Sequence, residues 1–315
     1  MINLIKISRF LGNMKVIKTV AEMQQYANEA RLAGKKIGLV PTMGYLHEGH
    51  MSLVDKARFE NSVVVVSIFV NPTQFAPNED LAAYPKDFEA DRKKCQEASV
   101  DVIFYPDEKE MYPNIHLTWV DVDVITKKLC GKTRPTHFRG VATVVAKLFN
   151  IIKPNKAYFG QKDYQQSLVI IKMVKDLNFD VKIVTCPIVR EKDGLAMSSR
   201  NKYLSSDERK EAVVLYQSLE RAKWIITEGE KRAATIKFEM KQMIQKTSGE
   251  IEYIEVLNAK NLDNLDIIKG KVLVALAVKF GKARLIDNIV IDTDMSETQS
   301  VSEYVKKHRG IFNEL

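Results

Sequence analysis

Residues 36–53, KIGLVPTMGYLHEGHMSL, combine an apolar run, a turn with Pro41 and Gly44, two histidines and an amphipathic run. The order of these parts predicts a strand, a tight loop and a helix N-terminus. Such a terminus presents unpaired backbone N–H groups and the positive end of the peptide dipoles, so it can bind a phosphate. His47 and His50 lie there on one face of the first helical turn, where both imidazoles could donate to phosphate oxygens.

A zinc site is the competing functional interpretation of this motif. Zinc metalloproteases place two histidines four residues apart in HExxH, with the Glu as general base. In this chain His50 comes three residues after His47, so the spacing argues against zinc. A polar surface turn without a ligand is the third interpretation, and only the other segments of the chain can argue against it.

Composition sets the class of protein. A chain of 315 residues with 45% hydrophobic and 28% charged residues is long enough for a sizeable core and about two domains. No apolar run approaches the roughly 18 residues of a membrane span, so we expect a water-soluble, cytoplasmic enzyme with no membrane partner. The net charge of +8 is scattered among acidic residues without a basic tract, which favours anionic small molecules over nucleic acid. The cysteines lack metal or disulfide spacing: Cys95, Cys130 and Cys186.

The chain up to about residue 190 alternates strands and helices. VVVVSIFV at 63–70 is a continuous β-branched run, typical of a strand buried on both faces of a parallel sheet. With the strand 36–41 and the helix between them, it predicts a right-handed βαβ unit of a Rossmann-like sheet. Other helices are expected at 18–33, 87–98 and 141–152, other strands at 100–106, 119–122 and 181–189, and a short strand followed by a helix within 157–167.

Ligands of open α/β sheets bind outside the carboxyl ends of the strands. Asn71 and Gln74 follow the strand 63–70 and are placed to line that crevice, although residues of this kind also form plain turns. Lys162, at a strand-to-helix turn, is a natural phosphate contact, and Asp163 beside it suits a ribose hydroxyl. A salt bridge at the helix start is the alternative for this pair.

A second domain is indicated beyond Asn201. The sequence SSDE at 205–208 is a capping box before a helical apolar stripe, and another helix is expected at 233–246. Three β-rich runs at 251–257, 271–280 and 284–292 predict a small antiparallel sheet. We therefore expect an N-terminal extension at 1–13, a Rossmann-like domain at 14–189, a smaller α+β lid domain at 190–293 and a tail at 294–315.

Four segments together resemble a known family. In this order they are similar to the pantothenate synthetases, the pantoate–β-alanine ligases of the HxGH nucleotidyltransferase superfamily, from about Met14 to about Asp292. RPTHFRGV at 134–141 and AVKFGKARLIDN at 277–288 add to the likeness. The four segments are PTMGYLHEGH at 41–50, NPTQF at 71–75, FGQKDYQQ at 159–166 and MSSRN at 197–201.

The resemblance implies a reaction. In that family ATP and Mg²⁺ convert pantoate into a pantoyl adenylate with release of pyrophosphate, and β-alanine then attacks to give pantothenate and AMP. It implies a Rossmann-like domain, a smaller lid domain and a homodimer. Two departures are visible: Gln161 replaces the Glu that is common in the family, and Ala196 stands where class I synthetases have the first Lys of KMSKS.

The resemblance also implies residue roles. His50 is the expected proton donor, and the catalytic set is His50, His47, Lys162 and Arg200. The expected ATP site comprises Met43, Gly44, Tyr45, Leu46, His47, Glu48, Gly49, His50, Gly160, Gln161, Lys162, Asp163, Val189, Met197, Ser198, Ser199 and Arg200. Pantoate and β-alanine are expected at Gln74, Gln166, Asn71 and Met43, and metal ligands are not assigned.

Three rival functions can be weighed. Another adenylyltransferase is disfavoured by NPTQF and the paired glutamines. A class I tRNA-charging enzyme is disfavoured because the residues after the junction leave little room for an anticodon-binding domain. An RNA-binding protein would bind with steep salt dependence, but no aromatic-and-basic motif supports one.

Overall fold

The computed structural model describes residues 14–76, 79 and 81–294. The chain divides into two compact units, Met1–Lys202 and Tyr203–Leu315. The boundary thus falls after Lys202, whereas the sequence placed it between 189 and 190. The predicted N-terminal extension and all but the first residue of the predicted tail lie outside the described residues. Among those described, no helix is both long and apolar enough to cross a bilayer.

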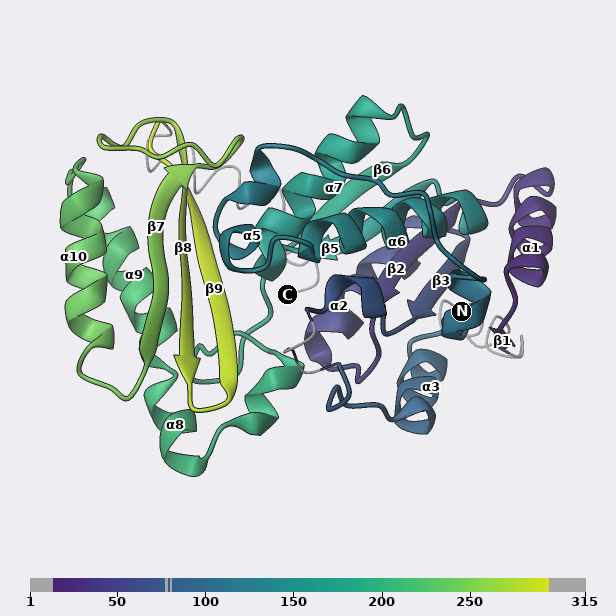
Figure 1. The fold of residues 1–315 in the computed structure, drawn as a ribbon, viewed down its shortest axis with the longest axis horizontal. Helices are drawn as coiled ribbons and strands as arrows, with labels where there is room; N and C mark the ends of the chain where they lie inside the picture. Colours follow the sequence, from purple (N-terminus) through teal and green to yellow (C-terminus); the bar gives the residue numbers. More distant parts are fainter. Residues whose placement is uncertain (1–13, 77–78, 80, 295–315) are drawn as a thin grey trace, which may run out of the picture. The chain divides into compact units, whose positions relative to one another are not determined.

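The first unit is built on a six-stranded parallel sheet with the order β1-β4-β3-β2-β5-β6 (Figure 1). From β2 the chain adds β3 and β4 on one side and then β5 and β6 on the other. The order therefore reverses between β2 and β5, which is where open α/β sheets bind their ligands. The strands are β1 (Lys15–Ile17), β2 (Ile37–Thr42), β3 (Val63–Ile68), β4 (Val102–Phe104), β5 (Lys156–Gly160) and β6 (Lys182–Cys186).

Helices cover both faces of this sheet, as the run of valines in β3 predicts. Alternate strand residues point to opposite faces, so Leu39 and Val65 join one core cluster while Val40 and Val66 join another. The first cluster packs under α1 (Val20–Leu32), α6 (His137–Ile152) and α7 (Tyr164–Asp176), and the second under α2 (Glu48–Glu60) and α3 (Phe88–Glu97). The short elements of the unit are α4 (Glu108–Met111), α5 (Cys130–Thr133), η1 (Pro72–Gln74), η2 (Ile125–Lys127) and η3 (Gln161–Asp163), and η4 (Ser199–Tyr203) runs across the boundary to the second unit.

One predicted strand is wrong. Residues 119–122 form no strand pairing and lead into the single turn η2. The Val120 N–H donates to the side-chain Oγ1 of Thr143 at 3.0 Å rather than to a neighbouring strand. A β-branched run alone cannot distinguish these two partners for an extended backbone.

The second unit has the predicted mixed character. Its antiparallel sheet consists of β7 (Glu250–Asn258), β8 (Lys271–Phe280) and β9 (Ala283–Asp292), in chain order. The helices are α8 (Ser206–Glu211), α9 (Val214–Thr227) and α10 (Ala233–Ile244), and α9 and α10 pack against each other and against the sheet (Figure 1). Ser205 and Glu208 form the predicted capping box at the start of α8. The role of this unit as a lid stays a prediction.

Candidate active site

The two histidines of HEGH cap the helix that they begin. His47 is the N-cap of α2, and its Nδ1 accepts the Gly49 N–H at 3.1 Å, while Nδ1 of His50 accepts the His47 N–H at 3.3 Å. Their ring centroids lie 4.1 Å apart. A neutral imidazole carries one proton, so a ring that accepts at Nδ1 keeps its proton at Nε2. Both residues are therefore fixed as Nε2–H donors at a helix N-terminus.

The surroundings keep both rings neutral at physiological pH. Burial, followed by the positive charges of Lys162 and Lys94, lowers the pKa of His47 to about 4. Burial, then His47 and the same two lysines, lowers the pKa of His50 to about 3. Lys162, which acts on both rings, belongs to η3, directly before α7. The nearby carboxylate of Asp163 acts on His47 in the opposite direction, more weakly than the two lysines. The two N–H donors and the lysine charges at a helix N-terminus suit this site to a polyphosphate.

Stability should fall on mild acidification. The pKa of His137 is also lowered to about 4, by burial and then by Arg134. An unfolded histidine titrates near 6.5, so between pH 6.5 and about 4 the unfolded chain binds more protons than the folded chain. The free energy of unfolding should therefore be flat above about pH 7 and decrease as the pH falls from 6.5 to about 5, before most carboxylates titrate. Urea denaturation at each pH measures this.

Matched variants identify the groups responsible for that decrease. His137→Asn should show a shallower decrease than the wild type over the same pH range because it lacks one of the titrating rings. A wild-type urea midpoint that does not change between pH 6.5 and 5 would contradict the neutral, buried state of these histidines.

The segment after β3 is held by Asn71. Its Nδ2 donates to Gln74 Oε1 at 3.1 Å and to the Gly140 carbonyl at 3.2 Å, and its Oδ1 accepts from the hydroxyls of Thr73 and Tyr112. Both amide hydrogens and both lone pairs are thus used within the protein. Asn71 is 1% exposed. The structure therefore favours a role for Asn71 in shaping η1 over the direct substrate contact that the sequence suggested.

The side-chain amide of Gln74 makes a weak contact that a ligand could replace. Among the described residues, its side-chain Nε2 donates one hydrogen bond, a weak one to the thioether of Met43 at 3.1 Å, so a better acceptor could take its place. This bond joins two segments that the sequence assigned to one substrate pocket. The Gln74 backbone carbonyl accepts from Arg134 Nη2 and lies 2.9 Å from His137 Nδ1. Gln74 thus has a fixed backbone and an adaptable amide.

RPTHFRGV provides the support for η1. Arg134 forms a two-point ion pair with Glu79 in addition to its bond to Gln74. A Cβ atom on Gly140 would lie 2.4 Å from the Thr73 carbonyl oxygen and 2.7 Å from the Gln74 nitrogen, so only glycine lets α6 pack this closely on η1. The sequence showed the motif as part of the resemblance, but not that it would contact NPTQF.

The two glutamines at the start of α7 differ in role. Gln165 is buried, with Oε1 bonded to the Cys130 N–H and Nε2 to the carbonyls of Ile125 and Lys128. It therefore holds the backbone between η2 and α5. Gln166 is half-buried, and no hydrogen bond of its side chain is seen within the described part of the chain. Binding of pantoate by Gln166 stays a prediction.

The loop after β6 folds back on itself. The Met197 N–H donates to the Val189 carbonyl at 3.0 Å, and Arg190 and Ala196 form an antiparallel bridge. A Cβ on Gly49 would lie 3.8 Å from Met197 Cβ, so this loop touches the first turn of α2. Ser198 Oγ accepts the Arg200 N–H at 3.3 Å. The position of the Arg200 guanidinium next to the histidines stays a prediction, as does the contact of Val189 with ATP.

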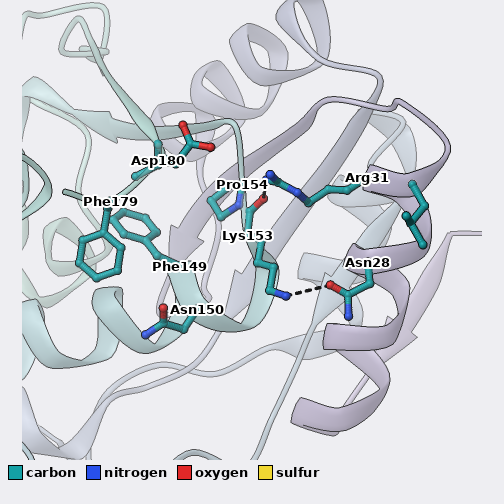
Figure 2. A pocket seen from close by; sticks show the side chains of 10 residues that line it. Asn28, Arg31, Phe149, Asn150, Lys153, Pro154, Phe179 and Asp180 are labelled. Atoms are coloured by element: carbon teal, nitrogen blue, oxygen red, sulfur yellow. Dashed lines mark hydrogen bonds between the residues drawn. The ribbon is translucent and has the colours of Figure 1, made fainter. Parts of the chain in front are cut away.

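A separate cavity lies away from these residues. It has a volume of about 680 Å³ and is bordered by Arg31, Phe149, Lys153 and Phe179 (Figure 2). Lys153 and Phe179 precede β5 and β6, so the cavity is at the amino ends of the strands. Its cations are engaged locally: Arg31 donates to the Lys153 carbonyl at 2.9 Å and Lys153 Nζ to Asn28 Oδ1 at 2.9 Å. This cavity contains none of the predicted site residues.

Comparison with known proteins decides the family. A family model described as pantoate-beta-alanine ligase matches residues 15–290. The chain belongs to the pantoate-beta-alanine ligase family. The pantothenate synthetase of Acetivibrio thermocellus is 58% identical over 280 residues, which are 89% of this chain and 100% of that protein. The predicted family is thereby confirmed.

Solved structures agree with this result. Pantothenate synthetase from Thermus thermophilus is 45% identical with a TM-score of 0.83, over 88% of this chain and 99% of that one. The ligase from Francisella tularensis, solved with beta-gamma ATP and beta-alanine, is 36% identical with a TM-score of 0.72, over 90% and 99%. The α/β fold class is confirmed, and the enzyme is a ligase that condenses pantoate with β-alanine in an ATP-dependent reaction.

Proposed function

We propose that the carboxyl edge of β2, β3 and β5 carries out this condensation through a pantoyl adenylate. The observation that carries the proposal is the pair of Nε2–H donors, His47 and His50, at the N-terminus of α2. The switch in strand order brings the end of β5 beside this turn. The hydrogen bond between Gln74 and Met43 joins the segment after β3 to the same turn.

The chemistry requires neutralisation and alignment. A carboxylate oxygen of pantoate attacks the α-phosphorus of ATP, the bond from that phosphorus to the α,β-bridging oxygen breaks, and pyrophosphate leaves with the electron pair. The anionic carboxylate is repelled by ATP until cations and N–H donors offset the phosphate charge. We assign this task to His47, His50, Lys162 and Arg200, with the helix N-terminus, and none of these groups forms a covalent bond.

The second step transfers the acyl group. The amine of β-alanine attacks the pantoyl carbonyl carbon, the acyl C–O bond breaks, and AMP leaves with the oxygen that pantoate supplied. We assign pantoate to Gln74 and Gln166, because amides can pair with both its hydroxyls and its carboxylate. Gln74 would also contact β-alanine. A site built for these groups discriminates against acids that lack them.

Magnesium fits this site as a companion of ATP. Among the described residues no group of three or more His, Cys, Asp or Glu could hold a metal ion. Mg²⁺ is commonly bound by substrate phosphates with one or two carboxylates, and Asp163 is the carboxylate of the predicted phosphate segment. We therefore propose that Mg²⁺ enters with ATP near Asp163, where it would reduce the negative charge of the phosphates.

We further propose a homodimer in the cytoplasm. One segment of the first unit exposes large apolar side chains that a second copy could cover: Ile115 at 85%, Leu117 at 83% and Val124 at 59% exposure. Sedimentation should then give twice the chain mass of 35.9 kDa, and a monomer at micromolar concentration would reject the dimer. Support for the compartment comes from Cys95, Cys130 and Cys186, which are buried free thiols.

The activity itself is tested by product analysis. Purified protein with ATP and Mg²⁺ receives D-pantoate and β-alanine, separately and together. AMP should accumulate only with both, at one AMP per pantothenate. If folded protein forms AMP equally well with another acid in place of pantoate, the substrate assignment fails. If it forms no AMP under any of these conditions, the assignment of the activity to this chain fails.

A further inference from the structure

The turn between β2 and α2 is held by a carboxylate from another helix. Asp91 of α3 is 2% exposed, and its two oxygens accept the N–H groups of Tyr45 at 2.8 Å and Leu46 at 2.7 Å. These two amides immediately precede His47, the N-cap of α2. A buried carboxylate that accepts two backbone N–H groups fixes the direction of both peptide planes. The side chain of Asp91 thus determines how the chain enters the histidine pair.

The same turn is conformationally demanding. Tyr45 has a φ of +54°, in the left-handed region that a residue with a side chain seldom adopts, and Gly44 before it has a φ of +83°. Such a conformation persists only when the surroundings impose it. A Cβ on Gly44 would lie 3.0 Å from Asp91 Oδ2, which shows how closely the carboxylate approaches the turn.

A second residue of α3 binds a backbone carbonyl of the same turn. Lys94 Nζ donates to the carbonyl oxygen of Leu46. Asp91 and Lys94 are three residues apart and therefore lie on one face of α3. Together they bind both the N–H and the C=O of Leu46, the residue directly before His47. The ammonium of Lys94 also contributes to the low pKa of both histidines.

We infer that Asp91 and Lys94 are positioning residues for the reaction, because they fix the left-handed turn that sets the two histidine donors in place. The inference rests on the proposed function of His47 and His50. Neither residue of α3 need touch ATP or pantoate. What they supply is the geometry of the donors, and a displacement of about 1 Å in such a group can lower the rate about a hundredfold.

Asp91→Asn is the sharpest test, since it preserves the shape of the side chain and removes one of its two acceptors. The amide group can accept from Tyr45 or from Leu46, and its NH₂ then faces the other N–H. We expect kcat to fall at least about tenfold while the KM values for ATP and pantoate change less than about threefold. Asp87→Asn is the matched control, because it makes the same change at the N-cap of α3, where Asn caps equally well.

Lys94→Met gives an independent test that keeps the buried length of the side chain. It removes the donor to Leu46 and should lower kcat several-fold, again with little change in KM. Lys93→Met, at the neighbouring exposed lysine, makes the same change in charge and should leave kcat unaltered. If circular dichroism shows that Asp91→Asn is not folded, the kcat values of Lys94→Met and Lys93→Met test the positioning role in its place.

The nitrogen-15 shifts of the histidine rings supply a readout that does not depend on activity. In the wild type, His47 and His50 should both show protonated Nε2 and unprotonated Nδ1. In Asp91→Asn these two rings should lose that single pattern, whereas His137 should keep its own. Unchanged ring shifts together with a kcat within threefold of the control would overturn the inference.

A parallel measurement on His50→Asn separates the two claims. If that variant keeps normal turnover, the proposed function of the histidines fails. If it loses turnover while folded Asp91→Asn and Lys94→Met match their controls, only the positioning role fails. Loss of kcat in all three, with altered ring shifts in Asp91→Asn, supports both.

Discussion

His50→Ala is expected to fold normally and to lose adenylate formation by about a hundredfold or more. Removal of one preorganised donor to a developing charge typically lowers kcat by a factor of about 10² to 10³. His50 is such a donor, because its Nδ1 is occupied by the His47 N–H and its proton is therefore at Nε2. Pyrophosphate release with ATP and pantoate measures the step before β-alanine enters.

His50→Asn distinguishes two roles of His50, the Nε2–H donor and the Nδ1 acceptor that caps the start of α2. The Asn side chain is short, so its oxygen can take the place of Nδ1 as the acceptor for His47 N–H, but nothing replaces Nε2–H. It should therefore be as stable as the wild type to urea and as inactive as His50→Ala. Turnover within threefold of the wild type in either variant would remove His50 from the mechanism.

Gln74→Ala should raise the KM for pantoate at least tenfold and change the KM for ATP less than about twofold. The Gln74 amide is held at Oε1 by Asn71 and is engaged only weakly at Nε2, so it is oriented and yet free to bind substrate. A lost hydrogen bond to a charged group is worth about 1.5 to 3 kcal/mol, or roughly ten- to hundredfold in affinity. Initial rates with each substrate varied in turn measure both constants.

A matched control guards this result against a general effect on stability. Gln25→Ala changes the same residue type on the exposed face of α1, where the side chain pairs with Glu29. It should leave both constants unchanged. Equal increases of the ATP and pantoate constants in Gln74→Ala would contradict the assignment of this residue to the pantoate pocket.

Much of the first unit could be predicted because its signals are local. The run of valines at 63–66 requires two covered faces, and both faces are covered. The junction between β2 and α2 could likewise be predicted, because the Pro-Gly turn and the two histidines that define it are adjacent in the sequence. The domain boundary was harder to predict. Residues 190–201 belong to the first unit through contacts such as the hydrogen bond from the Met197 N–H to the Val189 carbonyl, which the sequence does not reveal.

The support of the site could not be predicted. Asp91 lies in a polar helix where a carboxylate has no distinguishing pattern, and only the packing of α3 brings it to Tyr45 and Leu46. The adjacent residues Gln165 and Gln166 look alike in sequence, but helical rotation buries the first and leaves the second half-exposed. Side-chain direction and long-range pairing depend on the tertiary structure. The sequence therefore predicted which residues belong to the candidate site better than it predicted how they are arranged.

The most direct test of the adenylate is the fate of the carboxylate oxygens of pantoate. The enzyme is given D-pantoate labelled with ¹⁸O in its carboxylate, together with ATP, Mg²⁺ and β-alanine, and the AMP is analysed by mass spectrometry. Because the carboxylate attacks the α-phosphorus and the acyl C–O bond breaks later, each AMP should carry one ¹⁸O atom. AMP without the label, formed at the same rate as pantothenate, would contradict the account.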